Sequence, residues 1–299
     1  MPPAPRLAAV LTLIAALVAT LVGAACSSTP PEPAGPALLL LGEVHDNAAG
    51  HALRLQRLHQ QLTQGARPAL LMEQFDRERQ GEIDRLVQAA PGVPPGDAGL
   101  DATVDALVKL GGATGAGWTW DFYRPYLLLA LQYRLPIVAA NVSRGDARGV
   151  MQQGLSAGGF SAEVPTDIAA AHAGDIVRSH CGQINPAQAG RMALAQVARD
   201  QFMARQVEAY AARGVVLLAG NGHVRKDIGV PRWLGKAARG RATAVGYLET
   251  DDPASASPTD ADAFDAVIAM PAQQRDDPCN SMRAPAAPQP AARGPGLAG

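Results

Sequence analysis

Residues 37–47 read ALLLLGEVHDN, an apolar run that stops abruptly at a glycine and polar side chains. Apolar and polar residues do not alternate in this run, which is typical of a β-strand buried on both faces of a parallel sheet. Three further runs share this character, at residues 68–72, 136–140 and 215–219. We therefore expect a parallel sheet that contains at least these four strands.

Segments with helical periodicity separate the apolar runs. Apolar residues recur at helical spacing in residues 51–62, 77–87, 125–133 and 187–212. Two later strands are predicted at residues 242–248 and 266–270. Strands that alternate with helices predict an α/β fold, with a mostly parallel sheet flanked by helices and joined by right-handed crossovers.

Residues 144–201 interrupt this alternation, because they contain no strand pattern. Their helical patterns are broken at Gly158-Gly159 and at Asn185-Pro186. We predict a helical insertion over residues 144–201, beside a cleft at the ends of the strands.

Polar residues follow each of the four apolar runs. Glu43 and His45 follow the first run, Glu73 the second, Asn141 the third and His223 the fourth. Because parallel strands end at the same edge of a sheet, and open α/β sheets bind their ligands at that edge, these residues are expected to share one site. Each of them taken alone has a simpler explanation as a helix cap or a hydrogen-bonded structural residue. The repetition of Gly-x-x-His at residues 42–45 and 220–223 favours a functional site instead.

Two chemistries remain open for this site. Glu43, His45 and His223 could hold a divalent metal, since carboxylate and imidazole groups are common metal ligands. The same residues with Glu73 could equally form a metal-free catalytic group in which an acid and a base activate water. The sequence lacks the HExxH pattern, which excludes the helix motif of the metalloproteases.

The composition narrows the function classes. The chain has 299 residues and a net charge of −1, so it lacks the basic surplus of a nucleic-acid-binding protein. Its hydrophobic content of 47% is too high for a chain that is disordered throughout. The length suits one large domain or two small ones.

The N-terminus has the features of an export signal. Arg6 precedes an uncharged run at residues 7–25, and Cys26 follows two alanines in a pattern that resembles a bacterial lipobox. We predict a lipoprotein signal peptide over residues 1–25 and lipidation of Cys26. The alternative is an uncleaved membrane anchor, since the run approaches the roughly 20 residues that span a bilayer. Both alternatives place the rest of the chain outside the cytoplasm.

The remaining boundaries follow from composition. Residues 26–36 are rich in Pro and Ser and are expected to form a tether, whereas residues 37–280 form the folded domain. Residues 281–299 are rich in Pro, Ala and Gly and are predicted to be a disordered tail.

The cysteines divide into two groups if Cys26 carries lipid. Cys181 and Cys279 are then left, and an oxidising compartment favours a disulfide between them. Two buried free thiols are the alternative.

Several motifs together resemble a known family. They are GEVHDN at residues 42–47, MEQF at 72–75, HCG at 180–182, AQ and RD at 195–200, GNGHVR at 220–225 and GVP at 229–231. In this order they resemble the ChaN-like haem-binding lipoproteins of the wider Tiki and erythromycin-esterase-like group, over nearly all of residues 37–280. The resemblance implies a lipoprotein tethered to the outer membrane, facing the periplasm, that serves iron acquisition and binds haem between two protomers. It also implies an outer-membrane haem or iron receptor as a partner.

The haem that the resemblance implies would be bound non-covalently, since the sequence has no CxxCH motif. Haem iron takes His or Tyr as an axial ligand, and its propionates pair with Arg or Lys. We predict haem contacts from Tyr123, Tyr126, His180 and Arg225. Other possible ligands are Tyr133, Tyr210, Tyr247 and His172.

A different function follows from the same resemblance. In the esterase and Tiki relatives, residues that match Glu43, His45, Glu73 and His223 carry hydrolysis. A haem-binding protein of iron uptake is therefore the first hypothesis, and a hydrolase dependent on a metal or on Glu and His is the second. A purely structural envelope protein is the third.

Overall fold

The computed structural model describes residues 35–92, 98–112, 117–251, 262–277 and 279–280, all within one unit that begins at Gly35. The predicted signal peptide, Cys26, most of the tether and the predicted tail lie outside the described residues. Within the described part of the chain, no helix has both the length and the apolar character needed to cross a membrane.

Six strands form a single sheet in the order β3-β2-β4-β1-β5-β6, and every neighbouring pair is parallel. The strands are β1 (Leu38–Leu41), β2 (Ala69–Asp76), β3 (Ile137–Asn141), β4 (Val215–Leu218), β5 (Ala242–Thr250) and β6 (Ala266–Pro271). The predicted α/β class and all six predicted strands are confirmed. One boundary is wrong, because β2 continues to Asp76 and its register against β3 shifts after Met72, so Glu73 lies within the strand and not after it.

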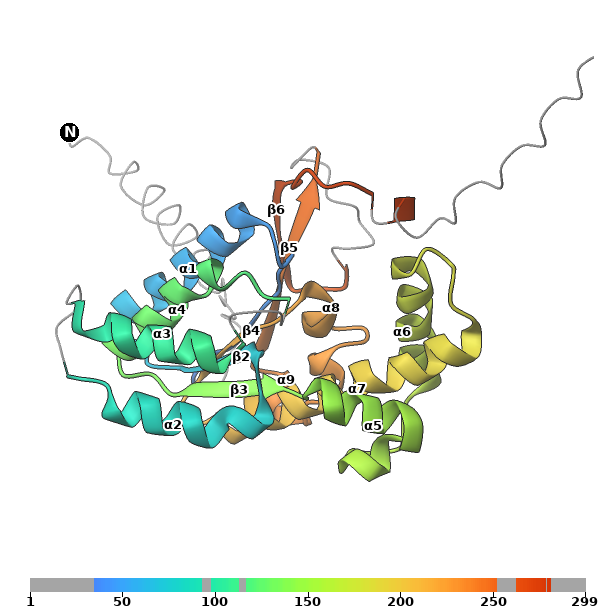
Figure 1. Ribbon diagram of the computed structural model, residues 1–299, viewed down its shortest axis with the longest axis horizontal. Helices are drawn as coiled ribbons and strands as arrows, with labels where there is room; N and C mark the ends of the chain where they lie inside the picture. Colours follow the sequence, from blue (N-terminus) through green and yellow to red (C-terminus); the bar gives the residue numbers. More distant parts are fainter. Residues whose placement is uncertain (1–34, 93–97, 113–116, 252–261, 278, 281–299) are drawn as a thin grey trace, which may run out of the picture. The chain divides into compact units, whose positions relative to one another are not determined.

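Helices cover both faces of the sheet, which explains why the strands are apolar on both sides. Leu39 and Leu41 of β1 belong to one core with α1 (Ala48–Thr63), α2 (Gln80–Ala89), α3 (Asp101–Leu110) and α4 (Arg124–Gln132). Leu38 and Leu40 belong to a second core with α7 (Pro186–Ala209), α8 (Asn221–Val224) and α9 (Lys236–Arg239). Figure 1 shows α1 to α4 gathered to the left of the sheet. Helix α3 was not predicted.

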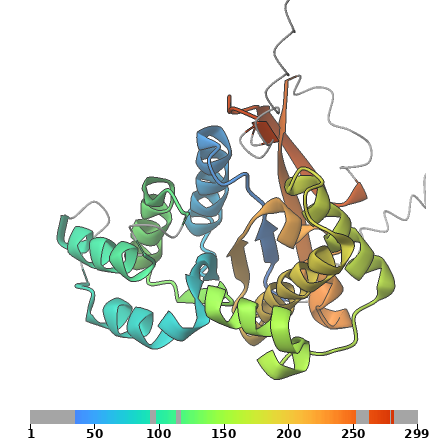
Figure 2. The ribbon, with the colours of Figure 1, turned by 45° about the vertical axis from the view of Figure 1, so that its right-hand side comes forward.

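The helical insertion between β3 and β4 is present. It consists of α5 (Arg144–Gln153), a short 3-10 turn at Leu155–Gly158, α6 (Thr166–Ser179) and α7. Helix α6 packs on the first part of α7 through Ile176, Ala189 and Ala193. Figures 1 and 2 show the two helices side by side. The last part of α7 lies on the sheet, so the insertion is anchored to the core by the same helix that carries α6.

The chain order creates a crevice at the centre of the sheet. Strands β1 and β4 are neighbours, yet α1 follows β1 onto one face and α8 follows β4 onto the other. Loops that leave adjacent parallel strands toward opposite faces open a crevice at the carboxyl ends of those strands. The two Gly-x-x-His segments therefore lie on either side of this crevice.

The structure contains the disulfide between Cys181 and Cys279. It joins the turn that follows α6 to the segment that follows β6, across 98 positions of sequence. The bridge therefore ties the helical insertion covalently to the C-terminal part of the domain.

Candidate functional site

The loop after β1 is fixed at both of its ends. Asn47 begins α1 by accepting a hydrogen bond from the backbone N–H of Gly50 at 2.9 Å. At the other end, a Cβ on Gly42 would lie 2.1 Å from Oδ1 of Asn221, so only glycine fits. Asn221 in turn exchanges hydrogen bonds with the backbone of Tyr247, at 2.6 and 3.0 Å. The loops that follow β1 and β4 are thus held against each other and against β5.

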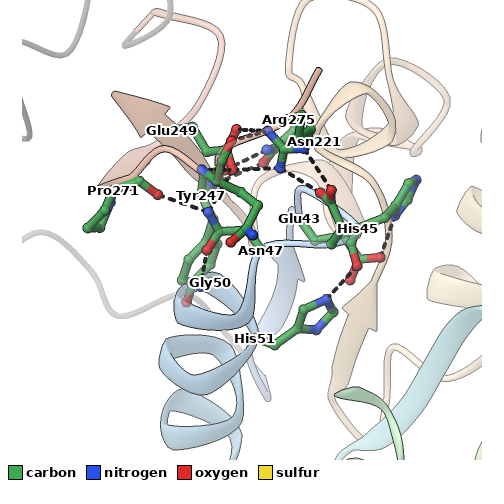
Figure 3. Close-up of polar contacts among 12 residues, drawn as sticks. Glu43, His45, Asn47, Gly50, His51, Asn221, Tyr247, Glu249, Pro271 and Arg275 are labelled. Atoms are coloured by element: carbon green, nitrogen blue, oxygen red, sulfur yellow. Dashed lines mark hydrogen bonds and ion pairs between the residues drawn. The ribbon is translucent and has the colours of Figure 1, made fainter. Parts of the chain in front are cut away.

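The segment after β6 holds the same loop from outside. Arg275 forms ion pairs with Asp46 at 2.5 Å and with Glu249 at 2.7 Å, and Asn47 donates to Glu249 and to the carbonyl of Pro271. Figure 3 shows Arg275, Glu249 and Asn47 joined in this network above helix α1. The hydrogen bonds from Arg275 lower the pKa of Glu249 to about 2, so this carboxylate is charged at neutral pH.

Glu43 is the buried centre of the site. Its carboxylate accepts hydrogen bonds from Arg54, from Tyr123 at 2.6 Å and from Gln74 at 3.4 Å, and it contacts Nδ1 of His45 at 2.7 Å. Burial raises the pKa of Glu43, but the charge of Arg54 and the hydrogen bond with His45 outweigh burial and lower it to about 2. Glu43 is therefore ionised at any physiological pH.

Arg54, on helix α1, is entirely buried, and its guanidinium forms an ion pair with Glu43. The sequence did not lead us to Arg54, although a signal was present. His51, Arg54, Leu58 and Leu62 are the side chains that α1 buries, and they recur at helical spacing. A charged residue on an otherwise apolar stripe indicates a buried ion pair.

His45 is the exposed member of the site, with half of its side chain accessible. Burial of the other half lowers the pKa of His45, but the hydrogen bond and charge of Glu43 raise it above its usual value. Among the described residues, only Nδ1 of this ring is hydrogen-bonded, and the ring of Trp118 packs edge-on at 4.6 Å. Glu43 therefore fixes the orientation of the ring (Figure 3), and Nε2 lies beside Gly220, where a Cβ would be 3.6 Å away.

A second group of charges lies beside the first. Nδ1 of His223 contacts Asp200 at 2.6 Å and its Nε2 lies 3.5 Å from Glu73. Glu73 also accepts a hydrogen bond from the backbone N–H of Gly220 at 2.8 Å. Burial lowers the pKa of His223, but Glu73 and Asp200 raise it to about 10, so the imidazolium is the form present at neutral pH. Nε2 of His172 lies 3.3 Å from the second oxygen of Asp200.

Two clefts meet at this site. The larger, of about 670 Å³, is lined by His45, Glu73, Gln74, Asp76, Trp118, Asn141, Ser143, Arg144 and Arg199, with Gly111, Gly117 and Gly145. The smaller, of about 460 Å³, is lined by residues of α6, α7 and α8 together with Glu43, His45 and Glu73. His45 and Glu73 belong to both clefts, so they stand on the boundary between them.

The four residues of the predicted polar site are brought together, whereas the predicted haem contacts are dispersed. Tyr123 reaches the site only through its hydroxyl on Glu43, and Tyr126 is fully buried with its hydroxyl on the carbonyl of His51. His180 ends α6, where its Nδ1 contacts the carbonyl of Ile176 at 2.8 Å. Arg225 forms an ion pair with Asp227 at 2.5 Å.

The alternative metal set does not fit the geometry. Within the described ranges, no three side chains of His, Cys, Asp or Glu converge as the ligands of one ion. Glu43 already accepts from Arg54 and Tyr123, and both ring nitrogens of His223 face carboxylates. A metal held by Glu43, His45 and His223 would have to displace these partners.

Comparison with known proteins gives one family match. A family profile described as haem-binding uptake, Tiki superfamily, ChaN matches residues 32–234. None of the curated proteins matches the chain.

Solved structures give a likeness of fold. A structure described as cofacial haem binding to ChaN of Campylobacter jejuni is similar with a TM-score of 0.58 and 17% identity, over 71% of this chain and 81% of that chain. A mutant erythromycin esterase in its open conformation has a TM-score of 0.40 and 14% identity, over 73% of this chain and 71% of that chain. An effector domain of a Vibrio vulnificus toxin has a TM-score of 0.36 and 16% identity, over 67% of this chain and 32% of that chain. The first of these likenesses shows a shared fold, and nothing below depends on the other two.

Removal of Arg54 should be far more costly than removal of an exposed arginine on the same helix. We expect Arg54→Met to lower the free energy of unfolding by about 3–5 kcal/mol, because it leaves the charge of Glu43 buried without its partner. Arg57→Met, at an exposed position of α1, is the control. The double variant Arg54→Met/Glu43→Gln should recover much of the lost free energy of unfolding, measured with urea. A loss in the double variant equal to the sum of the losses in the two single variants would contradict a paired charge.

The domain should become less stable at alkaline pH, because His223 then loses the proton that pairs it with Glu73 and Asp200. Its pKa is raised from 6.5 to about 10 on folding, so its contribution is complete below pH 6.5 and is lost as the pH rises toward 10. The free energy of unfolding of the wild type should fall from pH 6.5 to about pH 9, and that of His223→Asn should fall less. If the free energy of unfolding fell equally steeply with pH in both proteins, the raised pKa of His223 would be refuted. His59→Asn, at an exposed position, is the control and should behave as the wild type does.

Proposed function

The chain belongs to the ChaN family of haem-binding proteins in the Tiki superfamily, and from this premise we propose that it binds haem non-covalently in the larger cleft, with His45 as an axial ligand. The observation that carries the proposal is the position of His45, which is oriented by a carboxylate and exposed to the cleft. Its Nδ1 is held by a buried carboxylate, and its ring is half exposed on the cleft wall. Histidines that bind metals are commonly oriented by a carboxylate on the other ring nitrogen, which also makes them stronger ligands.

The cleft has the volume of a small-molecule site, and most of its lining is polar. Its volume of about 670 Å³ lies within the usual range of small-molecule sites. Trp118 forms part of its wall, and Gly220 lies beside the imidazole of His45, where a larger residue would crowd Cε1 and Nε2 at 3.3 and 3.6 Å. Bound haem would supply an iron centre that takes an imidazole ligand.

The protein's own residues have distinct tasks in this proposal. Glu43 holds the Nδ1 proton of His45 and thereby leaves Nε2 as the ligating atom. Arg54 and Tyr123 hold Glu43 in its charged form and in one position. Glu43 raises the pKa of His45, so a proton competes with an iron centre for the Nε2 atom of this ring.

A haem titration tests the proposal directly. The purified domain should give a saturable Soret shift with haemin, and His45→Ala should lose more affinity than the roughly 10–100-fold typical of losing an outer-shell partner. Glu43→Gln should fall within that range. His59→Ala, an exposed histidine on α1, should bind as the wild type does. Absence of saturable binding would overturn the proposed function, and normal binding by His45→Ala would move the axial ligand elsewhere.

We further propose that the protein is lipid-anchored through Cys26 in the bacterial envelope, on the periplasmic face of the outer membrane, and serves iron acquisition as a homodimer beside a haem or iron receptor. The support is the N-terminal sequence and the family. Cells that express the wild type should incorporate a palmitate analogue into the protein, and Cys26→Ala should not. Label that survives this substitution would contradict the anchor.

A hydrolase is the second candidate, and one observation favours it. His223 is protonated at neutral pH and held between Glu73 and Asp200. An imidazole that ligates haem iron does not require a second, charged histidine of this kind. His45, oriented by Glu43, could take a proton from water, and the imidazolium of His223 could stabilise the negative charge that develops on an ester or amide oxygen. The sequence GLSAG at residues 154–158 matches the pattern of a serine nucleophile turn. That turn requires a strand directly before it, whereas these residues directly follow helix α5.

An activity screen separates the two candidates. If the protein hydrolyses esters or amides through this site, Glu43→Gln should lower kcat/KM by about 100-fold or more. His59→Ala should leave the rate unchanged. Hydrolysis that is equal in Glu43→Gln and the wild type would assign the activity to another site or to a contaminant.

A further inference from the structure

The segment that follows β6 is bonded to the rest of the domain at two separate places. At the first, Arg275 forms an ion pair with Asp46 in the loop after β1. At the second, Cys279 forms the disulfide with Cys181 in the turn after α6. Because this segment joins the loop to the turn, we call it the strap, and it comprises residues 272–277 and 279–280. Figure 1 shows the strap in dark red, running from the end of β6 toward α6.

The two places belong to different walls of the smaller cleft. Asp46 directly follows His45, which forms part of the wall contributed by the loop after β1. Helix α6 contributes another wall, through His172, Asp175, Ile176 and Ser179. The strap therefore connects two walls of one cleft.

Helix α6 has few apolar contacts of its own. Of its 14 residues, only Ile168, His172 and Ile176 are buried. Ile176 packs against Ala189 and Ala193 of α7, and neither alanine has a side chain beyond Cβ. Because apolar stabilisation grows with the buried area, this contact holds α6 only weakly. The bridge adds a constraint on α6 that its packing does not supply.

The turn after α6 shows that its cysteine serves the bridge. The backbone N–H of Cys181 donates to the carbonyl of Arg178 at 3.0 Å, and that of Gly182 donates to the carbonyl of Val177 at 2.9 Å. This pair of hydrogen bonds defines a Schellman motif, in which the left-handed residue is usually glycine. Cys181 occupies that position with a φ of 58°, where a Cβ is disfavoured. A glycine would suit the turn better, so the side chain present here acts through its sulfur.

We propose that the strap is a redox-controlled fastening of the smaller cleft. With the bridge formed, α6 is held against the domain and closes one wall of the cleft. With the bridge reduced, α6 can move away and the cleft opens. The fastening acts whichever ligand the site binds.

A dithiol is the class of reductant that opens the fastening. One thiolate of the dithiol attacks a sulfur of the bridge and forms a mixed disulfide, and the other cysteine leaves as a thiolate that takes up a proton. The second thiol of the reductant then displaces the remaining cysteine. The protein gains two thiols and the reductant becomes a disulfide, so two electrons and two protons are transferred. Cys181 and Cys279 are both partly exposed, and a small dithiol can therefore reach them.

Hydrogen exchange of the full chain, followed by mass spectrometry, tests the fastening. Labelling times are chosen at which the amides of β1 and β4 stay protected in the oxidised protein. Complete reduction with dithiothreitol, checked as two additional thiols per chain, should speed exchange in residues 166–179 by about 10-fold or more. Reoxidation of the bridge should restore the slow exchange.

One variant separates the bridge from the turn. Cys181→Gly removes the bridge and gives the turn the residue that it favours. This variant should show the fast exchange of α6 without dithiothreitol, and the reagent should change its exchange no further. Reduction of the folded wild type needs no substitution, so it decides the question if the variant does not fold.

Three results would overturn the inference. The first is a bridge that stays intact in the folded protein under excess dithiothreitol. The second is unchanged exchange of α6 after complete reduction. The third is faster exchange that β1 and β4 share equally with α6, since a bridge that only stabilises the whole domain would give that result.

Discussion

The buried ion pair between Glu43 and Arg54 is the interaction on which the rest of the site depends. A carboxylate in the interior is tolerated only when a partner charge and further hydrogen bonds compensate its loss of hydration. Here Arg54 supplies the charge, and Tyr123, Gln74 and His45 occupy the remaining positions around the two oxygens. Arg54 is on α1, Gln74 on β2 and Tyr123 just before α4. Their contacts with Glu43 therefore hold these three segments against the loop after β1.

The topology of the sheet explains why this loop faces a second one of the same form. Strands β1 and β4 are adjacent, and their helices leave to opposite faces, so Gly42–His45 and Gly220–His223 meet across the crevice. Asn221 joins the two loops, since its backbone N–H donates to the carbonyl of Glu43 while its side chain is bonded to Tyr247. The two histidines can then differ in function. His45 is half exposed, whereas His223 is enclosed by Glu73 and Asp200.

The sequence predicted the features whose cause is local, and it missed those that depend on distant partners. Strands β1 to β4 were predictable because burial on both faces leaves an apolar run in each, and the site followed because polar residues come directly after these four runs. The role of Asp200 was not predictable, since its contact with His223 exists only once the insertion folds back on the sheet. Arg275 is 229 positions from Asp46, and nothing near either residue indicates their pairing. Tyr123 and Tyr126 are both buried, and the sequence does not show their burial because aromatic clusters look alike whether they line a cleft or fill a core.

The distribution of charge constrains what the cleft can bind. Near its inner end the buried carboxylates of Glu43, Glu73 and Asp200 face two full positive charges, those of Arg54 and His223, so a neutral His45 leaves this end with an excess of negative charge. The raised pKa of His45 reflects this excess, because a proton on His45 removes it. The far end carries Arg199 and Arg144 together with the carboxyl group of Asp76. A cationic group bound beside His45 would offset the excess at the inner end in the same way as this proton does.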